Sequence, residues 1–212
     1  MRIVQNKITD YLSINVTETE TAWSSGSLYY YADEVRQGHF IYKYAGENQT
    51  NTKDDPEVTY DRDKETYSVW VRVRPTNYWA ALDEKTFTRT VKADSLVIEL
   101  TNNDYDTVAL LNLNATDVTI ELIDLTTTDV LYTSSYDLNN TIDIVDEKSF
   151  WYNQFDYSTI VYEQNVPLLT NTKLKITINY TGDAVGVGRL IAGSSTYIGR
   201  TLYPATLDQI TY

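Results

Sequence analysis

Apolar and polar residues alternate along several stretches of this chain, most regularly in its second half. In DVTIELID (117–124), apolar side chains occupy every second position from Val118 to Leu122. SLVIEL (95–100) and TKLKITINY (172–180) repeat the pattern. Successive side chains of a β-strand point to opposite faces, so a period of two predicts strands with one face on a core and one in water. We therefore expect antiparallel sheets.

Short polar segments separate these strands at regular intervals. TNND (101–104), NAT (114–116) and TGD (181–183) are rich in residues that favour turns. Short strands at such a spacing are typical of a β-sandwich. The candidate helices are short and lie near residues 83–85 and 146–150. We predict an all-β protein whose main part is an antiparallel β-sandwich.

The first third of the chain has a different composition and predicts a separate small unit. It is rich in Tyr and Trp, and it contains the long polar stretch AGENQTNTKDDPEVTYDRDKET (45–66). A stretch of this length without apolar periodicity is expected to be a loop or an exposed hairpin. We predict a small aromatic-rich β module over residues 1–74, a junction over 75–85, and a sandwich domain with a C-terminal tail over 86–212.

The segment VWVRVRPTNYWAALDE (69–84) joins the two predicted units. Val69, Val71 and Val73 fall on one face of an extended segment, which predicts a buried strand. Pro75 ends that strand, because proline cannot donate a hydrogen bond to a sheet. The chain then enters a turn that contains Tyr78 and Trp79 and ends at the two carboxylates Asp83 and Glu84.

We expect this turn to be a structural corner. The side chains of Asn77 and Asp83 are suited to tying down a turn, and Trp79 is suited to filling the space between the units. Trp70, just before the proline, belongs to the same structural group. A catalytic role for Asp83 or Glu84 is the alternative.

Composition agrees with strands and narrows the possible partners. The chain has 19 Tyr among its 212 residues and a hydrophobic content of 42%. Abundant Val, Ile and Thr accompany the tyrosines, as expected of strands. The formal net charge is −13, and a surface this acidic repels the phosphates of nucleic acids. We expect no nucleic-acid partner.

The lack of cysteine and of long apolar runs indicates where the protein is made. Without cysteine, the chain forms neither disulfides nor thiolate zinc sites, which fits synthesis in a reducing cytoplasm. The N-terminal sequence lacks the apolar core of a signal peptide. No run approaches the roughly 18 apolar residues that a membrane helix needs. We expect no membrane insertion.

Catalysis needs a convergent set of reactive groups, and the sequence offers few candidates. The only histidine is His39, which we interpret as a surface or packing residue. No serine has the Gly-x-Ser-x-Gly context of a nucleophile elbow. With 30 acidic residues, chance explains the paired carboxylates Asp54–Asp55, Asp61–Asp63 and Asp83–Glu84. We predict no enzyme activity, no metal and no cofactor.

One set of residues in the first 70 positions resembles a family of sugar-binding modules. Its members follow the spacing of the small chitin- and cellulose-binding modules of type 5/12: Trp23, Gly26, Tyr29, Asp33, Val35, Gly38, Tyr42, Asn48 and Trp70. Ala32 stands where that family has a glycine. The resemblance implies a sugar platform of four rings, Trp23, Tyr29, Tyr42 and Trp70. Such a platform needs at least two of these rings exposed on a common face.

A second resemblance covers most of the chain. VRPTNYWAALD (73–83) is similar to the sequence G-P-T-N-R-W-A-M-F-D that follows such a module in structural proteins of tailed bacteriophages. Residues 108–124, 149–155 and 186–212 resemble further blocks of those proteins, in the same order. The resemblance implies a tail-associated virion protein with a jelly-roll-like sandwich.

Two hypotheses of function follow from these observations. The first is a non-enzymatic structural virion protein in the tail, collar or fibre-attachment region, present in many copies and bound to other tail proteins. It would assemble through complementary surfaces and strand addition at sheet edges, with residues 45–66 and 201–212 as candidate partner contacts. The alternative is a carbohydrate-binding adhesion module that recognises a host-surface glycan.

Overall fold

The protein is described from a computed structural model, which places residues 2–46, 50–51, 55–57, 60–61, 66–67, 69–101, 105–138 and 159–197. Strands dominate these residues, and the one helix among them is the short 3-10 helix η1 (Ala80–Leu82). None of their helices is long and apolar enough to cross a membrane. The predicted all-β fold class is confirmed.

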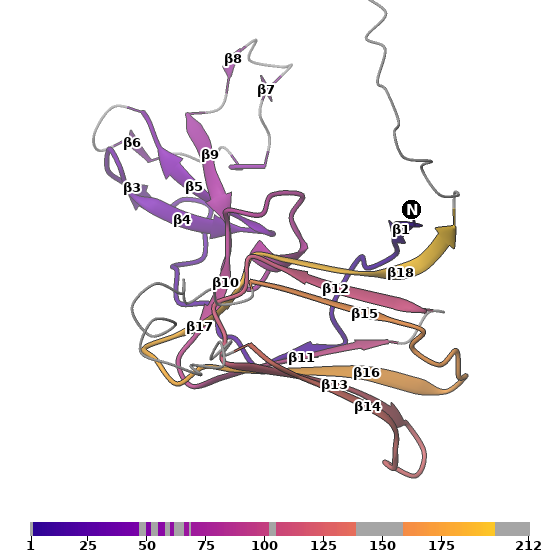
Figure 1. The fold of residues 1–212 in the computed structure, drawn as a ribbon. Coiled ribbons are helices and arrows are strands. Elements are labelled where there is room, and N and C mark those ends of the chain that lie inside the picture. The colour runs from indigo at the N-terminus through magenta and orange to yellow at the C-terminus, as the bar shows by residue number, and fades with distance from the viewer. Residues whose placement is uncertain are drawn as a thin grey trace, which may run out of the picture.

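Two antiparallel sheets packed face to face form the larger unit (Figure 1). The four-stranded sheet contains, in spatial order, β1 (Arg2–Asn6), β18 (Arg189–Tyr197), β12 (Thr107–Leu111) and β15 (Ile160–Gln164). The five-stranded sheet contains β14 (Val130–Asp137), β13 (Asp117–Asp124), β16 (Thr172–Asn179), β11 (Ser95–Thr101) and β2 (Ser13–Ile14). Every pairing in both sheets is antiparallel.

The order of the strands is that of a jelly roll. Without the two-residue β2, the two sheets of the described chain contain eight strands. When these are numbered along the chain, one sheet has the order 1-8-3-6 and the other 5-4-7-2. Consecutive strands therefore cross between the layers, except in the β13–β14 hairpin. The predicted jelly-roll-like sandwich is thus the observed architecture.

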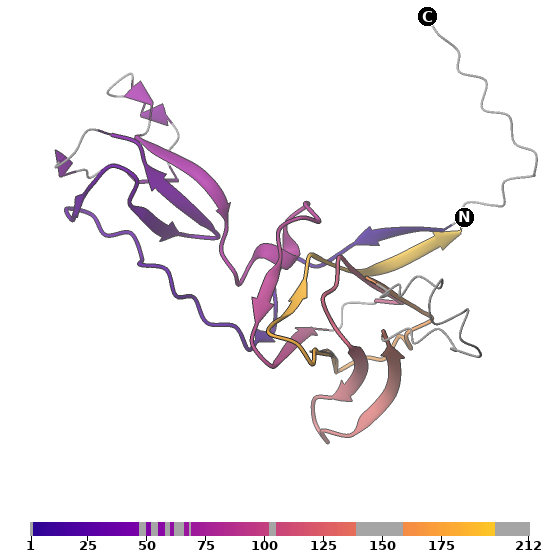
Figure 2. The ribbon, with the colours of Figure 1, turned by 60° about the vertical axis from the view of Figure 1, so that its left-hand side comes forward.

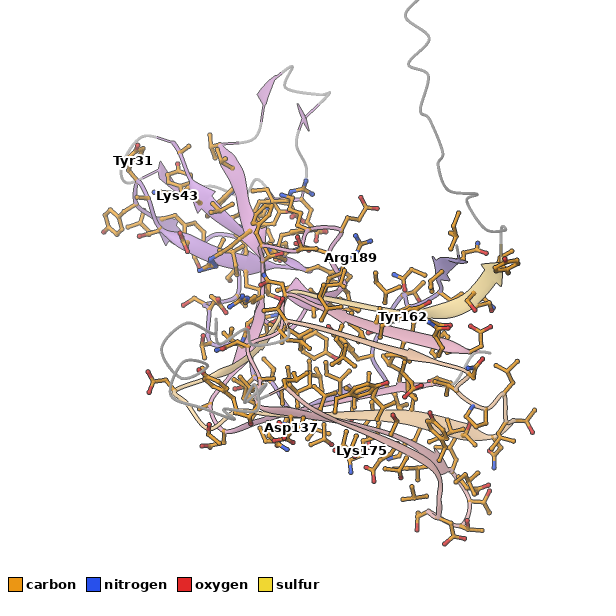
Figure 3. The ribbon with its side chains drawn as sticks, in the orientation of Figure 1. Tyr31, Lys43, Asp137, Tyr162, Lys175 and Arg189 are labelled. Atoms are coloured by element: carbon orange, nitrogen blue, oxygen red, sulfur yellow. The ribbon has the colours of Figure 1, made fainter. Side chains whose placement is uncertain are left out.

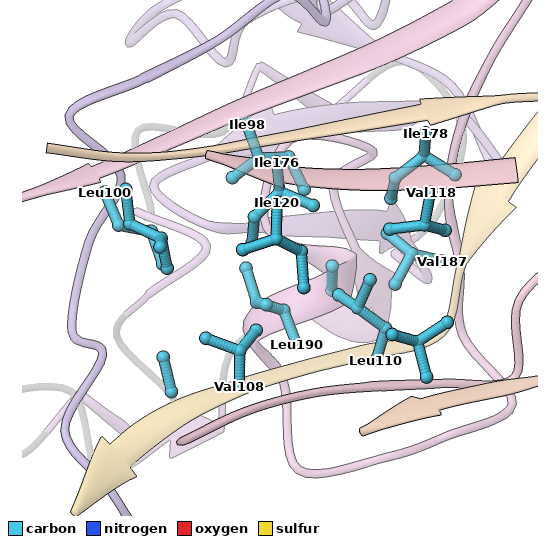
Figure 4. Close-up of a cluster of buried hydrophobic side chains, with 14 of the residues drawn as sticks. Ile98, Leu100, Val108, Leu110, Val118, Ile120, Ile176, Ile178, Val187 and Leu190 are labelled. Carbon is cyan, nitrogen blue, oxygen red and sulfur yellow. The ribbon is translucent and has the colours of Figure 1, made fainter. Parts of the chain in front are cut away.

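The alternating residues form the core between the sheets (Figure 4). In the five-stranded sheet they lie in three cross-strand rows, the central one made of Ile98, Ile176 and Ile120. All three are fully buried. Val108 and Leu110 of β12 close the core from the other sheet. Burying each such side chain contributes about 1.5–3 kcal/mol, so these rows hold the two layers together.

The outer face of the five-stranded sheet carries the polar half of the same alternation. Lys173 bonds Glu99 at 2.6 Å, and Lys175 bonds Glu121 at 2.9 Å. Figure 3 shows Lys175 on this sheet and Tyr162 on the other layer. Charges of both signs in neighbouring strands keep this face solvated and fix the strand register.

The smaller unit contains a three-stranded sheet and two short strand pairs. The sheet has the order β4 (Glu34–Gln37), β5 (Phe40–Tyr44) and β9 (Trp70–Pro75). The pairs are β3 (Leu28–Tyr29) with β6 (Thr50–Asn51), and β7 (Tyr60–Asp61) with β8 (Thr66–Tyr67). A further pair, β10 (Thr90–Lys92) with β17 (Val185–Val187), lies in the larger unit. Aromatic side chains make up most of the small core.

The predicted start of the small unit at residue 1 differs from the structure. β1 pairs with β18, from Arg2 opposite Tyr197 to Asn6 opposite Gly193, and β2 pairs with β11. The chain therefore begins in the sandwich, and the small unit is inserted between the first two strands of the jelly roll. The sequence RIVQN has no clear alternation, and its partner lies almost 200 residues away, so no local pattern indicates this pairing.

The strand predicted as buried in the segment 69–84 is not buried. Val71 and Val73 of β9 are exposed, and only Trp70 and Pro75 at its two ends are buried. β9 is an edge strand of a small sheet, whose core is already filled by aromatic rings. Of the other predicted segments, 201–212, 149–155 and most of 45–66 lie outside the described residues.

Candidate functional site

The corner between the two units is built around the side chain of Asn77. Its Nδ2 donates to the carbonyl oxygen of Val91 at 2.8 Å, and its Oδ1 accepts from the Val91 backbone nitrogen at 2.8 Å. The backbone oxygen of Asn77 accepts from Oγ1 of Thr90, also at 2.8 Å. One amide therefore pairs with β10 as a neighbouring strand would, and this joins the end of β9 to the sandwich.

Two further polar side chains hold the turn that follows. The Thr90 hydroxyl oxygen accepts from the backbone nitrogen of Ala81 at 2.9 Å, in the buried first turn of η1. The Asp83 carboxylate accepts from the Lys85 backbone nitrogen at 2.8 Å and from the Thr88 hydroxyl at 2.7 Å. Asp83 thereby closes the loop between η1 and β10, the role that aspartate commonly has in turns.

Four rings from three segments meet at this corner, and we call them the junction clamp: Tyr11, His39, Tyr78 and Trp79. The rings of His39 and Trp79 stack, with centroids 3.6 Å apart and planes at 21°. Tyr78 lies 5.2 Å from Trp79 and 5.3 Å from Tyr11, measured between centroids. Trp79, which is partly buried, thus contacts the small unit through His39 and the sandwich through Tyr11.

Backbone contacts reinforce the His39 side of the clamp. His39 follows Gly38 in the turn between β4 and β5, and Gly38 has φ +55°, which glycine adopts without strain. The carbonyl oxygen of His39 accepts from the Thr76 backbone nitrogen at 2.9 Å. This turn of the small unit is therefore fixed to the corner by one ring stack and one hydrogen bond.

The tyrosines of the clamp are held in their neutral form. Burial raises the pKa of Tyr11 far above its usual value, and the negative charge of Asp10 adds to the rise. Burial also raises the pKa of Tyr78, as do the charges of Asp10 and Glu18. Desolvation disfavours the phenolate, so neither ring supplies a base near neutral pH, and their contribution is packing.

Two hollows lie at the corner between the units, among the residues that the structure describes. One, of about 160 Å³, is lined by residues that include His39, Trp79 and Asp83. The other, of about 380 Å³, is lined by Arg74 and Arg89 among others. Arg74 is already engaged, at 3.0 Å from Glu34 and 3.7 Å from Glu20. Within the described part of the chain, no group of three or more His, Cys, Asp or Glu side chains is placed to hold a metal ion.

The four rings predicted as a sugar platform do not form one. Tyr29, Tyr42 and Trp70 are only 6%, 6% and 5% exposed, and Trp23 packs partly buried against them. Trp70 meets Tyr29 edge-on at 5.0 Å and Tyr44 at 5.1 Å. A unit this small has few aliphatic side chains for its interior, so these rings form its core and have no common face in solvent.

The structure brings together most of the residues predicted for the junction. Pro75, Asn77, Trp79 and Asp83 all lie at the corner between the units. Trp70 does not, because its ring lies in the core of the small unit.

Sequence reasoning missed several residues that the structure shows to matter. Tyr11 and His39 reach Trp79 from distant parts of the chain, and no local pattern indicates that. Tyr78 is the exception, because it adjoins Trp79 in sequence. Among the described side chains of the small unit, the exposed aromatic ones are Tyr30 and Tyr31, which are 49% and 65% exposed. They lie in a turn that Asp33 closes by accepting from the Tyr30 backbone nitrogen at 2.8 Å.

No model of a known protein family matches this chain, and no curated protein matches it either.

Proposed function

We propose that this protein is a non-enzymatic structural component of a tailed-bacteriophage virion, in the tail, collar or fibre-attachment region. It is made in the host cytoplasm and acts by assembling, in many copies, with other tail proteins. The observation that carries the proposal is the junction clamp, which joins an inserted module to a jelly roll through stacked rings and backbone hydrogen bonds.

The junction clamp and the residues around it support an architectural role, because the polar and titratable side chains of the corner contact other parts of the protein. The only histidine of the chain stacks on Trp79, and both oxygens of the Asp83 carboxylate accept hydrogen bonds within the loop. The amide of Asn77 pairs with the backbone of β10. These contacts restrict the movement of one unit against the other, which suits a part that transmits force or sets spacing in a particle.

The position of the corner also supports the phage assignment. The residues that resemble the bacteriophage sequence, 73–83, include Pro75, Asn77, Trp79 and Asp83, which build the corner. A motif with this structural purpose is expected wherever a small module must be fixed to a following sandwich. The assignment to a tail rests on the resemblance itself.

Labelling of phage particles tests the proposal. Antibodies raised against the purified protein should bind at the tail or collar of particles from a phage that encodes this sequence, as seen by immunogold electron microscopy. Quantitative mass spectrometry of the same particles should give several copies per virion. Protein that is abundant in infected cells but missing from purified particles would overturn the proposal.

Host-glycan binding is the second candidate function, and one observation favours it. Tyr30 and Tyr31 of the small unit are 49% and 65% exposed, and exposed aromatic rings can stack on the apolar faces of sugars. On a host-glycan array, a Tyr30→Ala/Tyr31→Ala variant should lose binding, whereas Tyr197→Ala, an exposed tyrosine of the sandwich, should keep it. Equal binding by both variants, or no binding by the native chain, would exclude this site.

A further inference from the structure

β14 forms one edge of the five-stranded sheet. Among the described residues it pairs only with β13, from Asp117 opposite Asp137 to Ile123 opposite Val130. Its side chains are exposed or partly exposed along the whole strand. Figure 2 shows the β13–β14 hairpin projecting from the sandwich. A strand in this position presents its outer backbone groups for pairing with another chain.

Apart from a bulge near its start, the sequence of β14 lacks the usual protection of an edge strand. Natural edges carry lysines, prolines or inward-pointing charges that prevent pairing. From Val130 to Tyr136 this strand contains no charged residue and no proline. Its one irregularity is a bulge near the start, opposite Leu122 and Ile123, so the stretch after it is regular. The hairpin therefore offers an uncharged, pairing-competent edge.

The absence of charge from Val130 to Tyr136 argues for a particular occupant of this edge. With a net charge of −13, two copies repel each other wherever their acidic surfaces meet. An uncharged edge is the place where this repulsion is smallest, and an edge pairing with itself needs no second complementary surface. The occupant that fits this edge is therefore a second copy of the same chain.

We propose that two copies of this protein join by antiparallel pairing of β14 with β14, about a twofold axis at Ser134. The two five-stranded sheets then continue into one sheet across the interface. This inference rests on the proposed assembly role, because it names the surface through which copies of the chain first associate.

The register follows from the pattern of faces along the strand. Tyr132, Ser134 and Tyr136 are half-buried on the side of the core, and Thr133 and Ser135 are exposed on the outer side. Residues directly opposite in an antiparallel pair share a face of the sheet. With the axis at Ser134, Tyr132 lies opposite Tyr136 of the partner subunit, and Thr133 lies opposite Ser135 of the partner subunit. Aromatic residues then meet aromatic residues, and hydroxyl groups meet hydroxyl groups.

The same axis avoids like-charge contact at the end of the strand. Asp137 is the only charged residue of β14. In this register it lies opposite Leu131 of the partner subunit, so the two Asp137 carboxylates are separated by most of the strand. Registers centred nearer to Asp137 bring these carboxylates together and are disfavoured.

The tyrosines of the interface are already oriented by the fold. The hydroxyl of Tyr136 donates to Oε2 of Glu163 on β15 at 2.8 Å, across the seam between the two sheets. The side chain of Glu163 is buried. This hydrogen bond ties the β14 edge to the other layer, so the strand is presented in a fixed geometry rather than as a loose hairpin.

Cysteine crosslinking of the full chain tests both the surface and the register. The native chain has no cysteine, so Ser134→Cys introduces a single thiol, and in the proposed dimer the two thiols lie opposite each other within disulfide reach. Under mild oxidation we expect about tenfold more covalent dimer than for Thr181→Cys, an exposed turn position, because pairing raises the effective thiol concentration. Single cysteines at each position from 132 to 136 should crosslink most strongly at 134.

A charge test gives an independent measurement. The double variant Thr133→Lys/Ser135→Lys places lysines opposite each other across the axis and should abolish the concentration-dependent dimer seen by analytical ultracentrifugation. The matched control, Ser25→Lys/Thr181→Lys at two exposed turn positions, carries the same added charge and should dimerise as the native chain does. Crosslinking at 134 no stronger than at Thr181→Cys, or dimers unaffected by the lysines, would overturn the inference.

These outcomes separate this inference from the proposed function. If the lysines leave the dimer unaffected but phage particles still carry the protein at the tail, copies join through another surface and only the β14 pairing is wrong. If the β14 dimer forms but purified particles lack the protein, the virion role is wrong and the pairing stands. A monomeric native chain that binds a tail protein through β14 would show that the edge accepts a foreign strand, which also overturns the inference.

Discussion

Asn77 shows how a single side chain can take the place of a strand. Its amide both donates to and accepts from the backbone of Val91. Asn15 repeats the arrangement beside β11, where it donates to the carbonyl oxygen of Ser95 and accepts from the backbone nitrogen of Val97. In both places an asparagine pairs with backbone groups at a strand edge where no neighbouring strand continues.

Replacing Trp79 by alanine tests how much this single side chain of the junction clamp contributes to stability. The change removes the stack on His39 and the contacts with Tyr11 and Tyr78. Large-to-small changes of this kind cost about 3–5 kcal/mol when fully buried, and because Trp79 is partly buried we expect about 3 kcal/mol in urea denaturation. Phe87→Ala, at a ring 75% exposed, should change the free energy of unfolding by less than about 0.5 kcal/mol. Equal effects of the two changes would contradict the clamp.

A substitution at Ala32 should raise the free energy of unfolding, whereas the substitution at Trp79 lowers it. It has φ +75°, a conformation that costs residues with a Cβ roughly 1–2 kcal/mol and that glycine adopts freely. Ala32→Gly should therefore raise the free energy of unfolding by about 0.5–1 kcal/mol, after the greater flexibility of glycine in the unfolded chain is subtracted. Ala184→Gly, at a partly buried position without positive φ, should destabilise instead. Stabilisation at both positions would show that the strain argument is wrong.

At the scale of strands, the period of two was a reliable guide wherever the core is aliphatic. Leu96, Leu174 and Val118 occupy buried positions in their strands, as their alternation predicts. The same rule failed for Val71 and Val73 in β9, which are exposed. The period of two identifies a strand and its two faces, but whether one of those faces is buried depends on what packs against it.

The ion pairs on the outer face of the five-stranded sheet, Lys173–Glu99 and Lys175–Glu121, predict that the stability of the fold falls in acid. Burial raises the pKa of Glu99, but hydrogen bonds from Lys173 and Ser13 outweigh burial and leave it below its usual value. A carboxyl group with a depressed pKa stabilises the fold above about pH 4.3 and loses that contribution as the pH falls through the lowered value. Melting temperatures between pH 6 and 3 should thus fall more steeply for the native chain than for Glu99→Gln. Parallel curves would contradict the role of this pair.

At the scale of the whole molecule, the jelly roll is closed by strands from both ends of the described chain. β1 and β18 pair directly, and the small unit is inserted between β1 and β11. The two units are therefore linked by two chain crossings as well as by the junction clamp. A double connection of this kind limits how far the units can move apart.

The buried and half-buried tyrosines predict that the stability of the whole fold falls at alkaline pH. Burial is the largest cause of raised pKa values at Tyr11, Tyr42, Tyr78, Tyr132 and Tyr136. A group whose pKa is raised by folding gives its stabilisation below the unfolded value, near 10, and loses it as the pH rises toward the folded value. Thermal stability should therefore fall between pH 10 and 12.

Ultraviolet absorbance gives the measurement for this prediction. The tyrosinate absorbance of the buried rings should rise together with unfolding, because folding raises their pKa values. Tyr11→Phe should reduce the loss of stability at high pH, while Tyr197→Phe should not. A melting temperature that stays constant from pH 8 to 12 would contradict the prediction.

Local chemistry explains how much of this protein was predictable from its sequence. Alternation identified the strands that carry Ile98, Ile120 and Ile176, and turn residues separated them, so the all-β class followed directly. Pro75, Asn77 and Asp83 pointed to a corner because their preferences act within a few residues. The formation of strands, the division of each strand into two faces and the positions of turns depend on near neighbours in the chain, and the sequence by itself determined these.

The tertiary structure decided everything that depends on distant partners. It brought β1 to β18 and placed His39 and Tyr11 against Trp79. It also buried Tyr29 and Trp70 in the core of the small unit rather than on a sugar platform. Burial and long-range pairing are properties of the whole packed chain, because the same aromatic ring serves equally well in a core or at a surface. The choice between those positions is set by the other residues that compete for the same limited interior.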